Sequence, residues 1–257
     1  MKKYIYPDEG DKLTYLFINT ESDEKYWDES EKNVLNMMIS RIKEFPQKPS
    51  LLDLGCGMGR LFPMFASYVK SITGVDPDES RLTEAIKEAK KIREIEIELI
   101  NGDITKVEKN KYDVVLISHI FQHIPKNTIE NIVEKLSKMI PIGGIICTTT
   151  TYTDSKKDVY TMEYLKDGKR VSKRIDEKTF NENISNNGIL PVREMSFNTM
   201  KTIFGSYGFV VEKMVGYHFK KENTKEELSV ENDNQMNKTG NIKNAKDSMY
   251  IFRKVDK

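Results

Sequence analysis

The chain has 257 residues, with 41 basic and 40 acidic side chains and a formal net charge of +1. This near-neutral balance excludes a nucleic-acid clamp that works through global positive charge, and it also excludes an acidic tail protein. The length fits one large domain or two small ones, and we expect a single domain over residues 1–257.

The N-terminal segment lacks the apolar core of a signal peptide. No apolar run reaches the roughly 18 residues that a membrane span needs. Only two cysteines occur, Cys56 and Cys147, which is not a disulfide framework. These features predict a cytoplasmic protein with no membrane partner.

Residues 1–48 are expected to form an N-terminal helical cap. Ser30 is a plausible N-cap for a helix that ends near Phe45, before Pro46. The apolar residues of this helix recur at spacings of three and four, so one face should be buried. That face comprises Val34, Leu35, Met38, Ile42 and Phe45.

Residues 49–150 alternate strand and helix patterns without a break. This order predicts a Rossmann-like, doubly wound α/β fold with a mostly parallel sheet and helices on both faces. The expected strands cover residues 50–54, 71–75, 95–100, 113–117 and 144–149, and the expected helices cover 60–69, 79–92 and 127–140.

Residues 151–195 read as an insertion. The stretch from Val159 to Ile175 alternates around Asp167-Gly168, a strong two-residue hairpin turn. We expect this inserted β-hairpin to act as a substrate lid. Pairing across the turn should place on one face Tyr160, Met162, Tyr164, Val171 and Ile175.

Residues 196–257 should complete the domain. A helix capped by Ser196 is followed by strands at 209–217 and 249–254. The intervening stretch, 220–247, is dominated by Lys, Glu, Asn and Thr, which predicts a polar loop.

The segment from Leu51 to Arg60 carries the most chemical information, because a strand runs into three glycines at alternate positions, Gly55, Gly57 and Gly59. Glycines allow a sharp turn and a close approach of a ligand to the backbone. The spacing is not that of dinucleotide-binding loops, because Arg60 stands where a third glycine is needed. Asp53, just before the loop, would repel a pyrophosphate and suits a ligand that carries an ammonium group.

Two further acids follow strands of the expected sheet. Asp76 ends the second strand, where a carboxylate can accept both hydroxyls of a ribose. Asp103 ends the third strand. Each of these residues could simply cap a helix, but three acids and a glycine loop along the carboxyl edge of one parallel sheet favour a ligand site.

With these motifs, the sequence resembles the class I S-adenosylmethionine-dependent methyltransferases, small-molecule branch, over about residues 49–150. The segments at 53–59 (DLGCGMG), 74–76 (GVD), 101–104 (NGDI) and 113–125 (DVVLISHIFQHIP) carry the resemblance. It implies a seven-stranded sheet whose last strand is antiparallel, S-adenosylmethionine as cofactor, S-adenosylhomocysteine as product, and no metal. The cofactor contacts it implies lie at Asp53, Gly55, Cys56, Gly57, Arg60, Asp76, Pro77, Asp103, Ile104, Ser118 and His119.

Two groups of residues are candidates for the acceptor side of the site. His119 and His123 could each act as a general base or position the substrate, since histidine titrates near neutral pH; either could equally brace the local turn. No acid or cysteine at ligand spacing accompanies them, so we expect no metal. The lid candidates, which could instead be ordinary packing residues, are Tyr26, Trp27, Tyr160, Tyr164 and Arg193.

The sequence therefore predicts an enzyme that moves a methyl group by in-line displacement to a nitrogen or oxygen atom of a small molecule. The alternatives are an RNA or protein/peptide methyltransferase, a polyamine synthase on the same fold, and a non-catalytic S-adenosylmethionine-binding regulatory protein. A nucleic-acid partner is disfavoured by the charge balance, and a monomer or homodimer is expected.

Overall fold

The computed structural model describes residues 21–108, 111–167, 169–186, 189–220, 228–229 and 242–256. The side chains of residues 21–30, 165, 169–170, 220 and 228–229 lie outside this description. Most of the expected polar loop at 220–247 and the first twenty residues of the expected cap therefore fall outside the described part of the chain.

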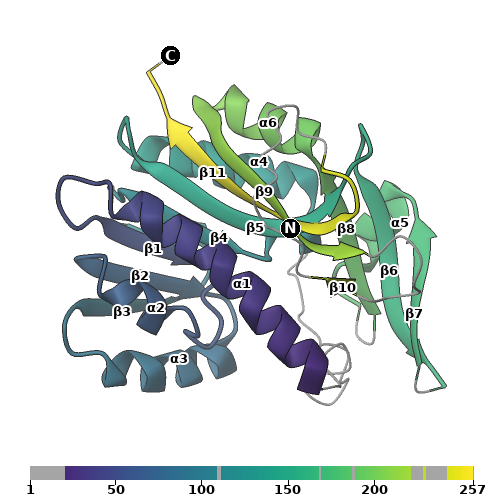
Figure 1. Cartoon of the computed structure of the whole chain (residues 1–257), viewed down its shortest axis with the longest axis horizontal. Helices are drawn as coiled ribbons and strands as arrows, with labels where there is room; N and C mark the ends of the chain where they lie inside the picture. The colour runs from purple at the N-terminus through teal and green to yellow at the C-terminus, as the bar shows by residue number, and fades with distance from the viewer. Residues whose placement is uncertain are drawn as a thin grey trace.

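A twisted sheet forms the centre of the structure (Figure 1). Its strands lie in the order β9, β11, β5, β4, β1, β2, β3, and β5 through β3 are parallel to one another. The last strand, β11, runs antiparallel to both β5 and β9, as predicted. The bounds are β1 Ser50–Leu54, β2 Ser71–Asp76, β3 Glu96–Asn101, β4 Val114–Ser118, β5 Ile145–Thr153, β9 Phe209–Lys220 and β11 Ala245–Lys254, with the two-residue β10 Leu228–Ser229 beside β9.

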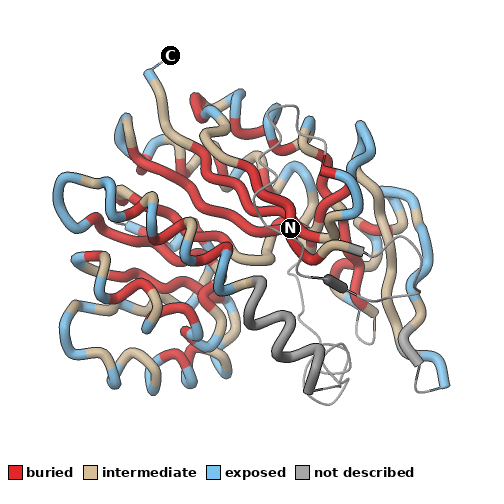
Figure 2. The backbone as a smooth tube through the Cα atoms, in the orientation of Figure 1, coloured by how far each residue is buried: buried red, intermediate tan, exposed pale blue. Residues whose placement is uncertain are grey.

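Helices cover both faces of this sheet, which confirms the doubly wound α/β class. One core cluster joins the sheet to α1 (Glu21–Ile42), α2 (Phe62–Ala66) and α3 (Glu79–Lys91). The other joins it to α4 (Lys126–Met139) and α6 (Phe197–Ser206). In Figure 1, α1 crosses the near face diagonally, and Figure 2 shows the sheet beneath it as almost continuously buried. Two short 3₁₀ helices, η2 (Ile104–Lys106) and η3 (Phe121–His123), follow β3 and β4.

The insertion forms a small sheet beside the main one (Figure 1, right). Strands β6 (Val159–Lys166) and β7 (Lys169–Ile175) pair around the predicted turn. The register sets Tyr160 opposite Ile175 and Tyr164 opposite Val171, which confirms the predicted shared face. Two elements of the insertion were not predicted: α5 (Glu177–Asn183) and β8 (Ile189–Ser196), which joins β6 to the end of β5.

Three local expectations are wrong. The first helix begins at Glu21, not at Ser30, because residues 21–30 contain no glycine or proline to stop it. The helix expected over 60–69 is reduced to α2. The apolar spacing within residues 79–92 also predicts that Ile86 faces inward with Leu82 and Ala85, but Ile86 is 43% exposed, and α3 fully buries only the other two.

The cap of α6 offers a test of this architecture. The Ser196 hydroxyl accepts the Thr199 amide at 3.2 Å, so replacing it by alanine leaves that amide without its partner. We expect Ser196→Ala to lower the free energy of unfolding by about 1 kcal/mol in a urea titration. Ser206→Ala, at the exposed end of the same helix, should change it by less than about 0.5 kcal/mol. Equal effects of the two substitutions would contradict the assigned cap.

Candidate cofactor and acceptor site

The glycine loop turns the chain from the end of β1 across the end of β2. The Gly55 and Cys56 amides both donate to the Val75 carbonyl, at 2.7 and 3.1 Å. Gly55, Gly57 and Gly59 all have positive φ, at 82°, 54° and 76°. Left-handed backbone is open to glycine at little cost, which explains the alternate-position spacing in the sequence.

Gly55 and Gly57 are glycines for different reasons. A Cβ at Gly55 would stand 2.4 Å from Ile120 Cδ1. The space that a side chain at this position would need is therefore already occupied by Ile120, in the segment that follows β4. At Gly57 the nearest atom to a Cβ is Arg81 Nη1, at 4.0 Å. The backbone at Gly57 therefore faces open space, and that is the point of the loop at which a ligand can approach.

The Asp76 carboxylate joins this loop to the end of β2. Its Oδ2 accepts the Gly57 amide and its Oδ1 accepts the Asp78 amide, both at 2.9 Å. Asp76 therefore does not cap the following helix, because the N-cap of α3 is Asp78. A carboxylate oxygen has two acceptor positions, so one remains on each oxygen for a ligand hydroxyl.

Asp53 lies beneath the loop, 2% exposed, and no described residue donates a hydrogen bond to its carboxylate. Burial and the nearby Asp76 charge raise the pKa of Asp53 from 3.8 to about 7, against the opposing charge of Arg60. A buried carboxylate without a partner is costly, which indicates a site that a cationic ligand group completes.

The other residues predicted near the cofactor lie along the same edge. Asp103 accepts the Thr105 amide at 2.7 Å and caps η2, and hydrogen bonds from Thr105 lower its pKa. Ile104 is buried and Pro77 is exposed. Burial raises the pKa of the Cys56 thiol, so Cys56 is a packed, un-ionised side chain.

Arg60 makes a contact that the sequence did not indicate. Its guanidinium donates to both carboxylate oxygens of Glu31 on α1, at 2.6 and 2.8 Å. Burial raises the pKa of Glu31, but the hydrogen bond and charge of Arg60 outweigh it and leave that pKa below its usual value. The pair ties α1 to the end of the glycine loop.

His119 comes directly after β4 with a φ of 53°. Its Nε2 lies 3.0 Å from the Tyr217 hydroxyl and its Nδ1 lies 3.1 Å from the amide nitrogen of Gln122. Burial lowers the pKa of His119, although the carboxylates of Asp247 and Glu31 oppose this effect. The ring is therefore neutral at pH 7, with both nitrogens on protein partners.

A second buried pair lies behind this ring. His218 Nδ1 is 2.6 Å from Asp247 Oδ2, and both side chains are 2% exposed or less. Burial raises the pKa of Asp247, but the hydrogen bond from His218 outweighs it and lowers that pKa overall. Neither residue, nor Tyr217 nor Glu31, was singled out as a site residue, because they come from segments far from the glycine motif.

His123 and Arg193 hold the insertion against the rim of the site. His123 Nδ1 lies 3.2 Å from the Pro191 carbonyl, and burial lowers its pKa to about 4. Arg193, fully buried, donates to the Ile124 carbonyl at 3.1 Å, and its guanidinium lies 5.4 Å from the ring centres of both Tyr160 and Phe180. These contacts pack Tyr160 into the insertion, while Tyr164 lies farther along β6, half-buried. The side chains of Tyr26 and Trp27 lie outside the described residues.

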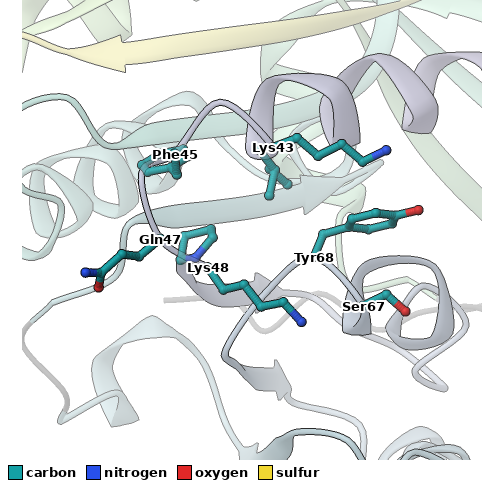
Figure 3. Close-up of a pocket in the computed structure, with 8 residues that line it drawn as sticks. Lys43, Phe45, Gln47, Lys48, Ser67 and Tyr68 are labelled. Carbon is teal, nitrogen blue, oxygen red and sulfur yellow. The ribbon is translucent and has the colours of Figure 1, made fainter.

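A separate groove lies at the opposite, amino edge of the sheet (Figure 3). It has a volume of about 190 Å³ and is bounded by the loop after α1 and the loop after α2. Lys43 packs over the Tyr68 ring there, 4.6 Å from its centre. The groove is therefore distinct from the glycine loop and its acids.

The described residues contain no group of three or more histidine, cysteine or acidic side chains that could hold a metal ion. None of the helices within the described ranges is long and apolar enough to cross a membrane. Cys56 and Cys147 are both buried and unbridged.

The donor and acceptor set fits a nucleoside cofactor with a cationic amino-acid portion. The buried Asp53 suits an ammonium group, the open backbone at Gly57 allows close approach, and Asp76 keeps acceptor positions for ribose hydroxyls. A doubly wound sheet with this edge defines the nucleoside-binding α/β class.

Comparisons with known proteins narrow that class. Residues 51–144 match the family model described as "Methyltransferase domain". A ubiquinone biosynthesis O-methyltransferase of Pelagibacter ubique is 28% identical over 133 residues, 51% of this chain and 54% of that protein. The matched region thus spans about half the length of this curated relative.

Solved structures share the fold over most of the chain. A S-adenosylmethionine-dependent methyltransferase from Clostridium acetobutylicum has a TM-score of 0.59 at 15% identity, covering 96% of each chain. The Burkholderia thailandensis 1,6-didemethyltoxoflavin-N1-methyltransferase, solved with 1,6-didemethyltoxoflavin and S-adenosylhomocysteine, has a TM-score of 0.57 at 11% identity, covering 100% of this chain and 93% of that one. Residues 51–144 thus match the kind of domain that the sequence predicted, and the chain shares the fold of these S-adenosylmethionine-dependent methyltransferases.

The raised pKa of Asp53 gives a stability test without any ligand. Between pH 4 and 7 the folded state holds a proton that the unfolded state has lost, so stability falls as pH rises through that window and is lowest above pH 7. Asp53→Asn removes this loss. We therefore compare the free energy of unfolding of the variant with that of the wild type at each pH. The difference, variant minus wild type, should be roughly 2–3 kcal/mol larger at pH 8 than at pH 5.

Asp78→Asn is the control for this measurement. Burial raises the pKa of Asp78, but hydrogen bonds from Ser80 and Arg81 leave it below its usual value, so its carboxylate is ionised across that range. Its effect on the free energy of unfolding should be the same at pH 5 and pH 8. If the effect of Asp53→Asn on the free energy of unfolding is also the same at pH 5 and pH 8, the pKa of Asp53 is not raised.

Proposed function

We propose that this chain is a S-adenosylmethionine-dependent methyltransferase that acts on a nitrogen or oxygen atom of a small molecule. The observation that carries the proposal is the buried Asp53 carboxylate, to which no described residue donates a hydrogen bond, beside the open backbone at Gly57 and the doubly hydrogen-bonded Asp76. The match of residues 51–144 to the methyltransferase-domain model supports the same activity.

In the proposed complex, Asp53 receives the ammonium group, Gly57 approaches the methionine portion and Asp76 receives the ribose hydroxyls. Asp103 and Ile104 meet the adenine edge. When bound, the cofactor supplies an electrophilic methyl group on a positively charged sulfur. The residues of the chain then have to align the acceptor and exclude water. Such alignment can lower the activation free energy by up to ~7–11 kcal/mol in the best-oriented cases.

A small acceptor is supported by the similar proteins, one named for ubiquinone biosynthesis and one solved with a bound heterocycle. One is named as an O-methyltransferase and the other as an N-methyltransferase, so both acceptor atoms stay within the proposal. The insertion packs beside the rim through His123 and Arg193, in a position that suits the lid role. His119 and His123 stay candidates for the base. The cytoplasmic location and the monomeric or homodimeric state stay predictions.

An RNA acceptor is the main alternative. Lys166, Lys173 and Arg174 on the β6–β7 hairpin are exposed and basic, but the whole chain is nearly neutral. A non-catalytic regulatory protein would need only the cofactor site, so binding alone does not separate it from an enzyme.

Calorimetry with S-adenosylhomocysteine tests the cofactor site. Asp76→Asn removes a charged acceptor from the ribose position, and we expect its dissociation constant to rise at least about tenfold. Asp154→Asn, an exposed site beyond β5, should bind like the wild type. Thermal unfolding of each variant verifies that the fold is kept. If the wild type binds neither S-adenosylhomocysteine nor S-adenosylmethionine, the proposal is wrong.

A labelled-methyl screen tests the reaction. Labelled S-adenosylmethionine is offered with a protein-free metabolite extract, with peptides and with RNA, and label should pass to the metabolite extract only. Transfer to RNA would support the alternative. Tight S-adenosylhomocysteine binding with no transfer to any pool would indicate the regulatory role.

A further inference from the structure

The ring of His119 is placed where a substrate proton cannot reach it directly. Nε2 faces the Tyr217 hydroxyl and Nδ1 faces the Gln122 side chain. A group whose two nitrogens both have protein partners takes up a proton only through one of those partners. Tyr217 is the partner that can pass a proton on, because a phenol both donates and accepts.

A row of hydroxyl groups continues from Tyr217 toward the site. Burial raises the pKa of Tyr217, and the Thr149 hydroxyl on β5 opposes this effect. The Thr149 Oγ1 also lies 3.1 Å from Ser118 Oγ, at the carboxyl end of β4. Tyr217 is fully buried, Thr149 is 2% exposed and Ser118 is half-buried, so the row opens at the Ser118 end.

The strand alternation explains why these side chains form a row. Leu116, Cys147 and Val215 pack in the core cluster that contains α1. Ser118, Thr149 and Tyr217 each follow two residues later on the same strand, and therefore lie on the same face of the sheet.

We propose that Ser118, Thr149 and Tyr217 form a hydroxyl relay that carries the acceptor's proton to His119 Nε2. This inference rests on the proposed methyl transfer, since an amine or hydroxyl acceptor must lose a proton in that reaction. It makes Ser118 the catalytic residue that touches the acceptor, and Thr149 and Tyr217 positioning residues that act through their neighbours.

The relay requires one orientation of Gln122. To pass protons inward, each hydroxyl donates to the next group, and Nε2 accepts from Tyr217. His119 then carries its proton on Nδ1 and donates it to the amide oxygen of Gln122. The two ends of an amide group are nearly indistinguishable in shape, and a half-turn brings this oxygen to Nδ1 in place of the nitrogen.

The charges around the ring suit a transient imidazolium. Burial disfavours a charge on His119, and the carboxylates of Asp247 on β11 and Glu31 on α1 oppose that effect. His218 and Arg60 act in the other direction, but each is itself paired with one of those two acids. The cluster is thus balanced at rest and gains one positive charge when the relay operates.

The step balances in atoms and charge. The acceptor gains a methyl group and loses one proton. That proton passes to Ser118 Oγ, the Ser118 proton to Thr149, the Thr149 proton to Tyr217, and the Tyr217 proton to His119 Nε2. The positive charge lost when the carbon–sulfur bond breaks reappears on His119, and solvent takes the proton after product release.

The position of the proton on His119 tests the relay without an acceptor. The chain has three histidines, so ¹⁵N spectra of histidine-labelled protein with S-adenosylhomocysteine resolve each ring. We expect the Nδ1–H tautomer for His119 at pH 7, and loss of this preference in Tyr217→Phe. Tyr250→Phe removes a buried hydroxyl on the opposite face of β11 and should leave His119 unchanged. An Nε2–H tautomer in the wild type overturns the relay, because the ring then donates to Tyr217.

A second pair of variants tests the middle of the row. Thr149→Val should lower the initial rate of labelled methyl transfer to the metabolite extract by about 10²-fold, within the range for lost base catalysis, with the affinity for S-adenosylhomocysteine unchanged. Thr150→Val, whose buried hydroxyl faces the other way, should keep the rate within about twofold. A wild-type rate in Thr149→Val overturns the relay. If the wild type itself labels nothing, the proposed function fails, while the tautomer still decides whether His119 can accept a proton.

Discussion

The Asp76 carboxylate connects the parts of the site that the sequence keeps apart. One oxygen accepts the Gly57 amide and the other accepts the Asp78 amide, so a single side chain fixes both the glycine loop and the start of α3. The loop in turn covers Asp53, and the charge of Asp76 contributes to the raised pKa of that residue. In the proposed cofactor site, the charges of Asp53 and Asp76 therefore disfavour each other, and the ammonium group of a bound ligand would offset this repulsion.

Polar groups from distant segments complete the site on the face covered by α1. Glu31 reaches Arg60 from that helix, and Tyr217 and Asp247 come from the two antiparallel strands at the far side of β5. Glu31 and Asp247 each have a cationic or imidazole partner, whereas Asp53 has none among the described residues. The contrast agrees with the proposal, in which the acceptor's proton goes to the balanced cluster around His119 and the cofactor's ammonium group goes to Asp53.

Much of the fold was predictable because it depends on local periodicity. The strands around Asp53 and Asp76 are short apolar runs that end at glycine or acid, and the Asp167 turn set the hairpin register. The strand β8 was missed because its pairing with the end of β5 is a long-range contact. The true start of α1 was missed because Ser30, a good cap residue, lies inside a longer helix. The contacts Glu31–Arg60 and His119–Tyr217 join residues 29 and 98 positions apart, and no motif spacing encodes them.

The proposed function depends most on which ligand groups Asp53, Gly57 and Asp76 bind. A crystal structure of the chain with S-adenosylhomocysteine tests this most directly. We expect the ligand's ammonium group to lie against the Asp53 carboxylate, its amino-acid portion over Gly57 and its ribose hydroxyls on Asp76. Density for the ligand elsewhere, or beside Gly57 with neither acid in contact, would contradict the proposed site.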